Sequence, residues 1–90
     1  MARPKKKRNL DHNIQCHEFV PLTNVCLENI HLSREEIEAI KLHDLLCMDQ
    51  IQASKKMQIS QSTFHRTLVS GRKKIADALI NIKAIRIHRE

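Results

Sequence analysis

The strongest constraint on the fold is a long helical period in the second half of the chain. Apolar or small side chains recur at spacings of 4, 3, 4, 3 and 4, at Phe64, Leu68, Gly71, Ile75, Ala78 and Ile82. This period predicts one continuous seam along about five turns of α-helix. Ser60 is a suitable N-cap, so the helix should begin at Gln61. Its solvent face would carry Gln61, Ser62, His65, Arg66, Val69, Arg72 and Lys73.

Two shorter helices are predicted before it. The Ser33–Glu36 capping box predicts a helix from Ser33 to about Leu46. We expect it to bury Ile37, Ile40, Leu45 and Leu46 and to leave Glu35, Glu38 and Lys41 in water. Asp49 would cap a helix of about two turns. The inner face of that second helix would hold Ile51, Ala53, Ser54 and Met57.

The composition agrees with a mainly α fold of one small domain. The 90 residues include a single Gly and two Pro, and a chain of this length buries too little surface for a deep substrate pocket. We therefore expect no enzyme and no cofactor. Two Phe and no Tyr or Trp disfavour single-strand binding by base stacking. With no long apolar run and three widely spaced Cys, the protein is expected to be soluble and cytoplasmic, with reduced thiols.

Four segments follow from these patterns. Residues 1–8 form a basic arm expected to be disordered, and residues 9–32 an irregular lead-in that has room for short strands. Residues 33–82 form the helical domain, and residues 83–90 a C-terminal tail or short strand. The alternation at Ile85 and Ile87 predicts that strand, and the stretch around Ile30 and Leu32 is its only apolar candidate partner.

The charges are strongly segregated along the chain. The net charge of +6 combines five bases and no acid in residues 1–8, an acidic segment of net −6 in residues 9–54, and a basic segment of net +7 in residues 55–90. Segregated positive charge is typical of a protein that binds a polyanion. A solvated helix face is the simpler alternative.

The second and third helices are spaced as a helix-turn-helix, which predicts binding to double-stranded DNA. Ala53 and Ser54 are small enough for a close helix crossing, and Met57, Ile59 and Phe64 would anchor the turn. Base-reading side chains would come from the opening turns of the long helix: Gln61, Ser62, His65 and Arg66. Phosphate contacts are expected from Arg3, Lys5, Lys6, Lys7, Arg8, Lys55, Lys56, Arg72, Lys73 and Lys74.

Three stretches of this sequence resemble the domain of unknown function 134 family: LSREEIEAIKLHD at 32–44, QSTFHRTL at 61–68 and RKKIADAL at 72–79. The opening MARPK is also similar to the family's basic start, so the resemblance covers almost the whole chain. It implies a three-helix domain similar to region 4 of sigma factors and a DNA-binding transcriptional regulator. The family usually has Gly in the turn where this chain has Gln58, and an acidic second helix where this chain has Lys55 and Lys56. A left-handed Gln58 would cost about 1 kcal/mol.

Two alternatives stay open from the residues alone. The long seam could instead pair with a partner helix or a second copy, giving a protein-interaction module or a homodimer, or it could be covered by residues 14–32. A metal site is the second alternative, and its candidate ligands lack the paired spacing of known sites, so none is predicted. These candidates are Cys16, His17, Cys26, His31, His43 and Cys47.

Overall fold

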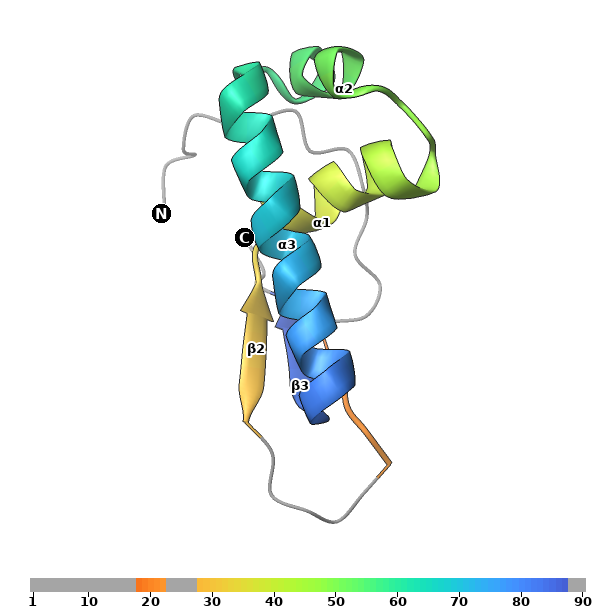
Figure 1. Cartoon of the computed structure of the whole chain (residues 1–90), viewed down its shortest axis with the longest axis vertical. Helices are drawn as coiled ribbons and strands as arrows, with labels where there is room; N and C mark the ends of the chain where they lie inside the picture. The colour runs from red at the N-terminus through yellow and green to blue at the C-terminus, as the bar shows by residue number, and fades with distance from the viewer. Residues whose placement is uncertain (1–17, 23–27, 88–90) are drawn as a thin grey trace, which may run out of the picture.

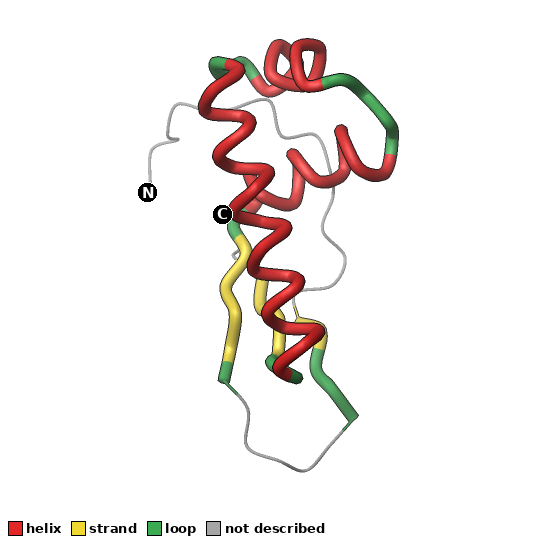
Figure 2. Tube along the Cα trace, viewed as in Figure 1, coloured by secondary structure: helices red, strands yellow, loops and turns green. Residues whose placement is uncertain are grey.

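A long helix organises the chain, with two short helices on one half of it and a small sheet on the other (Figure 1). The computed structural model describes residues 18–22 and 28–87. In chain order the elements are β1 (Glu18–Phe19), β2 (Asn29–Leu32), α1 (Arg34–Ile40), η1 (Lys41–Leu45), α2 (Gln50–Met57), α3 (Gln61–Asn81) and β3 (Ala84–Ile87). The mainly helical fold with short flanking strands is confirmed (Figure 2). The predicted arm at residues 1–8 lies outside the described residues, as does much of the lead-in.

All three predicted N-caps are present. Ser33 Oγ accepts from the Glu36 backbone N–H at 3.1 Å, and Glu36 Oε1 accepts in return from the Ser33 N–H at 2.9 Å. Asp49 Oδ1 accepts from the Gln52 N–H at 2.8 Å. Ser60 Oγ accepts from the Thr63 N–H at 3.1 Å. Each cap satisfies a backbone donor that has no partner inside its helix, which is why these positions could be predicted locally.

The core lies where α1, η1 and α2 meet the N-terminal half of α3. Its fully buried members are Ala39, Leu42, Ala53, Met57, Phe64 and Leu68. Ile59 of the turn packs against this cluster, so the predicted anchoring on both sides of the turn is confirmed. The core therefore fixes α2 against the first turns of α3.

The sheet covers the C-terminal half of α3 and has the strand order β1-β3-β2. β2 runs parallel to β3, with Ile30 opposite Ile85 and Leu32 opposite Ile87. The predicted pairing of the C-terminal strand is thus confirmed. β2 also packs against α3. The long seam is therefore covered in part by a segment of residues 14–32, one of the two outcomes that the sequence left open.

The predicted burial of the first helix is wrong beyond Ile40, at Leu45 and Leu46. There the chain forms η1, a π-helical turn in which the Leu46 N–H donates to the Lys41 carbonyl at 2.9 Å, across five residues. A π-helical turn holds more residues than an α-helical one, so it changes which side chains face inward. Leu42 is buried instead, while Leu45 and Leu46 are 72% and 56% exposed.

Three further side chains lie on the opposite side from the one predicted. Glu38 is buried rather than in water, and its Oε2 lies 3.3 Å from Lys41 Nζ. Ile51 of α2 is exposed, because the inner face is filled by Ala53, Ser54 and Met57. Ile82 ends α3 in a left-handed conformation and is exposed, so the buried part of the seam ends at Ala78.

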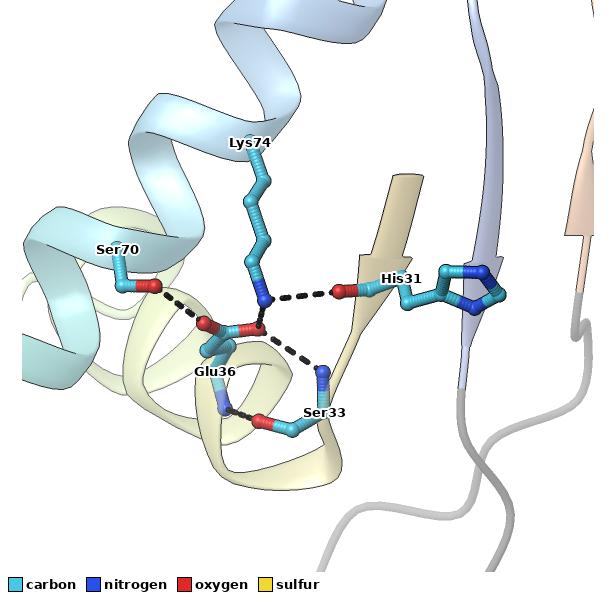
Figure 3. A network of polar contacts seen from close by, with 5 residues as sticks. All are labelled: His31, Ser33, Glu36, Ser70 and Lys74. Atoms are coloured by element: carbon cyan, nitrogen blue, oxygen red, sulfur yellow. Dashed lines mark hydrogen bonds and ion pairs between the residues drawn. The ribbon is translucent and has the colours of Figure 1, made fainter. Parts of the chain in front are cut away.

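The carboxylate of Glu36 joins three elements at one point (Figure 3). The Ser70 hydroxyl of α3 donates to Oε2 at 2.6 Å, and Lys74 Nζ of α3 lies 3.1 Å from Oε1. Lys74 also donates to the His31 carbonyl of β2 at 2.8 Å. Burial opposes ionisation of Glu36, but the hydrogen bonds from Ser70, the Ser33 N–H and Lys74 outweigh it, so the pKa of Glu36 lies below its ordinary value.

Gly71 lets α3 approach α1 closely enough for this network. A Cβ at Gly71 would lie 2.9 Å from Ile40 Cδ1 and 3.2 Å from Glu36 Cβ. A larger side chain there would crowd Ile40 Cδ1 and Glu36 Cβ, so these side chains or the helices would have to shift. Within the described part of the chain, α3 and the other helices are too short or too polar to cross a membrane.

The Glu36 network predicts a pH-dependent contribution to stability. Glu36→Gln removes the charge that faces Lys74 and should lower the free energy of unfolding at pH 7 by about 1–3 kcal/mol. Because the folded pKa is lowered, this contribution is present above the unfolded value of 4.5 and is lost as the pH falls through the folded value. Urea unfolding between about pH 7 and pH 3 should show the wild-type advantage shrinking in acid. Glu35→Gln is the control, with a smaller effect, and a pH-independent difference for Glu36→Gln would contradict the prediction.

The turn predicts a stabilising substitution. Gln58 has φ 62° and ψ 43°, the left-handed conformation that favours glycine. Gln58→Gly should therefore raise the free energy of unfolding by about 0.5–1 kcal/mol in urea denaturation. Gln52→Gly is the matched control, because it places the same change inside α2 and should destabilise by about 1 kcal/mol. Equal destabilisation by both changes would show that Gln58 is not strained.

Candidate functional site

The turn between α2 and α3 has only three residues, Gln58 to Ser60, and it is closed by backbone hydrogen bonds. The Gln58 N–H donates to the Lys55 carbonyl at 3.1 Å, and the Ile59 N–H to the Ser54 carbonyl at 3.0 Å. Ser54 is buried at the helix contact, where its hydroxyl donates to the Ile51 carbonyl at 2.8 Å. Small side chains at 53 and 54 and a closed turn therefore hold α2 at a fixed position against α3.

The outer face of α3 is polar over its first turns. All seven residues predicted to face solvent are exposed: Gln61, Ser62, His65, Arg66, Val69, Arg72 and Lys73. Gln61, Ser62, His65 and Arg66 all come from the first two turns, and the first turn contains no acidic residue. Phe64, between Ser62 and His65, and Leu68, two residues after Arg66, are buried and face the core. The four predicted base-reading residues are thus all exposed on the first two turns of α3, which contain no acidic residue of their own.

These four side chains differ in their hydrogen-bond partners within the chain. Ser62 Oγ lies 3.3 Å from Ser60 Oγ, and His65 Nδ1 lies 3.3 Å from Gln50 Oε1 of α2. Gln61 and Arg66 make no hydrogen bond or ion pair with the residues that the structure describes. Arg66 lines a shallow depression of about 320 Å³ between α3 and the start of α1, together with Ser33, Glu35, Glu36, Thr67 and Ser70. Gln61 and Arg66 are therefore the two members of the set with free polar groups.

The predicted phosphate-binding bases fall into three groups. Lys55 and Lys73 are exposed and have no acidic partner among residues 18–22 and 28–87. Lys56 is partly buried, and Arg72 and Lys74 are bound to carboxylates of the same chain. The arm bases Arg3, Lys5, Lys6, Lys7 and Arg8 lie outside the described residues.

Arg72 forms a two-pronged ion pair with Asp44 of η1. Its Nε donates to Asp44 Oδ2 at 3.0 Å, and its NH2 group donates to Oδ1. The hydrogen bond from Arg72 outweighs the effect of burial and holds the pKa of Asp44 below its ordinary value, and the same bond raises the pKa of Arg72. The guanidinium therefore ties α3 to η1, and a phosphate would have to compete with Asp44 for it.

The candidate metal ligands are not brought together where the structure describes them. No group of three or more His, Cys, Asp or Glu side chains in the described ranges could hold a metal ion. The His43 ring shares a hydrogen bond between Nδ1 and the Met48 carbonyl at 2.8 Å, and Cys47 is an exposed free thiol. Cys16, His17 and Cys26 lie outside these ranges.

The sequence did not predict three contacts that tie α3 to the rest of the chain. Gln50 contacts His65, Asp44 binds Arg72, and Glu36 binds Ser70 and Lys74. Their contacts join positions 15, 28 and more than 30 residues apart. Such distances carry no local periodic signal, and only the packing of the helices brings the pairs together. The sequence predicted Glu36 only as the partner of Ser33 in the capping box, which is the local part of its hydrogen bonding.

Comparison with known proteins places the chain in one family. A family model described as a protein of unknown function, DUF134, matches residues 1–89. A UPF0251 protein of Dehalococcoides mccartyi is 45% identical over 89 residues, which cover 97% of this chain and 76% of the relative. UPF0251 proteins of Halothermothrix orenii and Shewanella putrefaciens are 41% and 39% identical, over 96% and 97% of this chain and 65% and 91% of their own lengths. No solved structure matches the chain. The chain therefore belongs to the DUF134 family.

Proposed function

We propose that this protein binds double-stranded DNA, with α2, the turn and α3 acting as a helix-turn-helix similar to that of sigma factor region 4. The observation that carries the proposal is the exposure of Gln61, Ser62, His65 and Arg66 on the first two turns of a capped helix that packs against α2. Hydrogen-bonding side chains on the first turns of the second helix are what the major groove requires. We propose a binding protein that regulates transcription in the cytoplasm, and not an enzyme.

Base reading and phosphate binding would be divided among different side chains. The free guanidinium of Arg66 suits the two acceptors of guanine, and the amide of Gln61 suits adenine. Lys55 of α2 and Lys73 of α3 are exposed, and with Lys56 and the arm bases they would supply sequence-independent affinity. Arg72 and Lys74 already bind Asp44 and Glu36, so we assign them to orienting α3 rather than to primary phosphate contact.

A protein-interaction module is the second candidate function, and one observation favours it. Leu79, Ile80 and Ile82 are 74%, 77% and 54% exposed at the C-terminal end of α3. The buried part of the seam packs within the chain, so a second copy that pairs along the end of α3 would use these three exposed side chains instead. Apolar pairing of this kind depends weakly on salt, whereas phosphate binding weakens steeply with salt.

A titration of labelled duplex DNA by fluorescence anisotropy tests the proposal, with an unlabelled single strand as competitor and two salt concentrations. We expect tight duplex binding that salt weakens and the single strand does not displace. Arg66→Ala should weaken binding to a selected duplex by about 1–3 kcal/mol and relax its sequence preference. Lys73→Ala should weaken all duplexes alike and reduce the salt slope by about 1.

Lys83→Gln serves as the control for a lost positive charge, since Lys83 lies beyond α3 and pairs with Asp77 and Glu28. It should change duplex affinity less than Lys73→Ala does. Equal weakening of every duplex by Arg66→Ala would make Arg66 a phosphate contact. Absence of duplex binding at low salt would refute the proposed function.

A further inference from the structure

A side-chain contact between α2 and α3 constrains one of the predicted base-reading residues. Gln50 is the first residue of α2, and His65 lies in the second turn of α3. The Nδ1 atom of His65 is 3.3 Å from Oε1 of Gln50. His65 is exposed and Gln50 is partly buried, so the contact lies at the edge of the α2–α3 packing, on the same surface as Gln61 and Arg66.

This contact favours one of the two neutral tautomers of His65. An amide oxygen only accepts hydrogen bonds, so the contact with Gln50 Oε1 is a hydrogen bond in the tautomer whose Nδ1 carries the proton. A neutral imidazole has a single N–H, which leaves Nε2 with a lone pair and makes it an acceptor. No residue of the described ranges bonds to Nε2, so this acceptor is available to a ligand.

The major groove offers only two base groups that can donate to such an acceptor. They are the exocyclic amines, N6 of adenine and N4 of cytosine, whereas guanine and thymine present acceptors at this edge. An Nδ1–H imidazole therefore discriminates between amino-bearing and carbonyl-bearing bases. The opposite tautomer, with the proton on Nε2, would have the opposite preference.

We propose that Gln50 is a positioning residue that holds His65 in the Nδ1–H form, so that His65 Nε2 reads the exocyclic amine of an adenine or a cytosine. This inference rests on the proposed function and specifies the chemistry that one of its residues recognises. Gln50 itself need not touch DNA, because it acts through the ring of His65.

The first arm of the test needs no DNA. Long-range ¹H–¹⁵N spectra of the full chain at about pH 8 should show His65 protonated mainly at Nδ1. Gln50→Met should abolish this preference, because it removes the acceptor. Gln50→Glu should preserve it, because a carboxylate accepts and cannot donate. A wild-type ring protonated mainly at Nε2 would overturn the proposal, because Nδ1 would then have no proton to donate to Gln50 Oε1.

The second arm uses a duplex enriched by the wild-type protein from a randomised pool. Adenines are replaced one at a time by purine and cytosines by pyrimidin-2-one, each of which lacks only the exocyclic amine. At one position the replacement should weaken wild-type binding by about threefold to tenfold, the value of one neutral hydrogen bond. His65→Ala should bind both duplexes alike, which removes the effect of weakened base pairing from the comparison. The base found at that position distinguishes adenine from cytosine.

The Gln50 variants connect the two arms. Gln50→Met should lose most of the discrimination, and Gln50→Glu should keep it, even though its charge lowers affinity for every duplex. Gln52→Glu adds the same charge on α2 away from His65 and is the control for that uniform loss. If His65→Ala discriminates at every position as the wild type does, the proposal is overturned while DNA binding stands. If no duplex binds, the proposed function fails and this proposal fails with it, and the tautomer spectra then show whether the Gln50–His65 contact exists independently.

Discussion

The buried carboxylate of Glu36 is the interaction on which the arrangement of the other elements depends. It accepts from the N-terminus of its own helix, from Ser70 and Lys74 of α3, and through Lys74 it reaches the His31 carbonyl of β2. A chain this small buries a limited core, so one satisfied polar centre joining α1, α3 and β2 has a large effect on their relative placement. Gly71 provides the close helix approach that this centre needs.

The basic residues of α3 divide into those that pair with acidic residues of the same chain and those that stay exposed. The helix carries several bases, but Arg72 and Lys74 are bound by acids of η1 and α1. Part of the positive charge in the second half of the chain is therefore structural, and it neutralises part of the acidic middle segment. Among the residues that the structure describes, the charge left free lies at Lys55 of α2, at Arg66 in the second turn of α3 and at Lys73 farther along α3.

The helix caps and the exposed face of α3 were predictable from the sequence, whereas the buried side of the first helix beyond Ile40 was not. The caps at Ser33, Asp49 and Ser60 depend on residues three positions apart, and the exposed face of α3 follows from an uninterrupted helical period. The burial of Leu45 and Leu46 was predicted wrongly because η1 adds a π-helical turn that no propensity indicated. Glu38 was assigned to solvent by its charge alone.

The candidate site was likewise predictable only in part. Its exposed side chains could be named from helical spacing, but their partners could not. Gln50, Asp44 and Glu36 reach α3 only after the helices have packed. Arg72 and Lys74 therefore looked like free bases in the sequence, and His65 carried no sign of which nitrogen holds its proton.

The most direct test of the central claim is a backbone NMR titration of the full chain with a duplex selected from a randomised pool. The account predicts that the largest amide shifts fall at Gln61, Ser62, His65 and Arg66 and in the turn before them, with smaller shifts along the rest of α3. Shifts concentrated instead at Leu79, Ile80 and Ile82, with the start of α3 unchanged, would contradict it and would place the interaction surface at the opposite end of the helix.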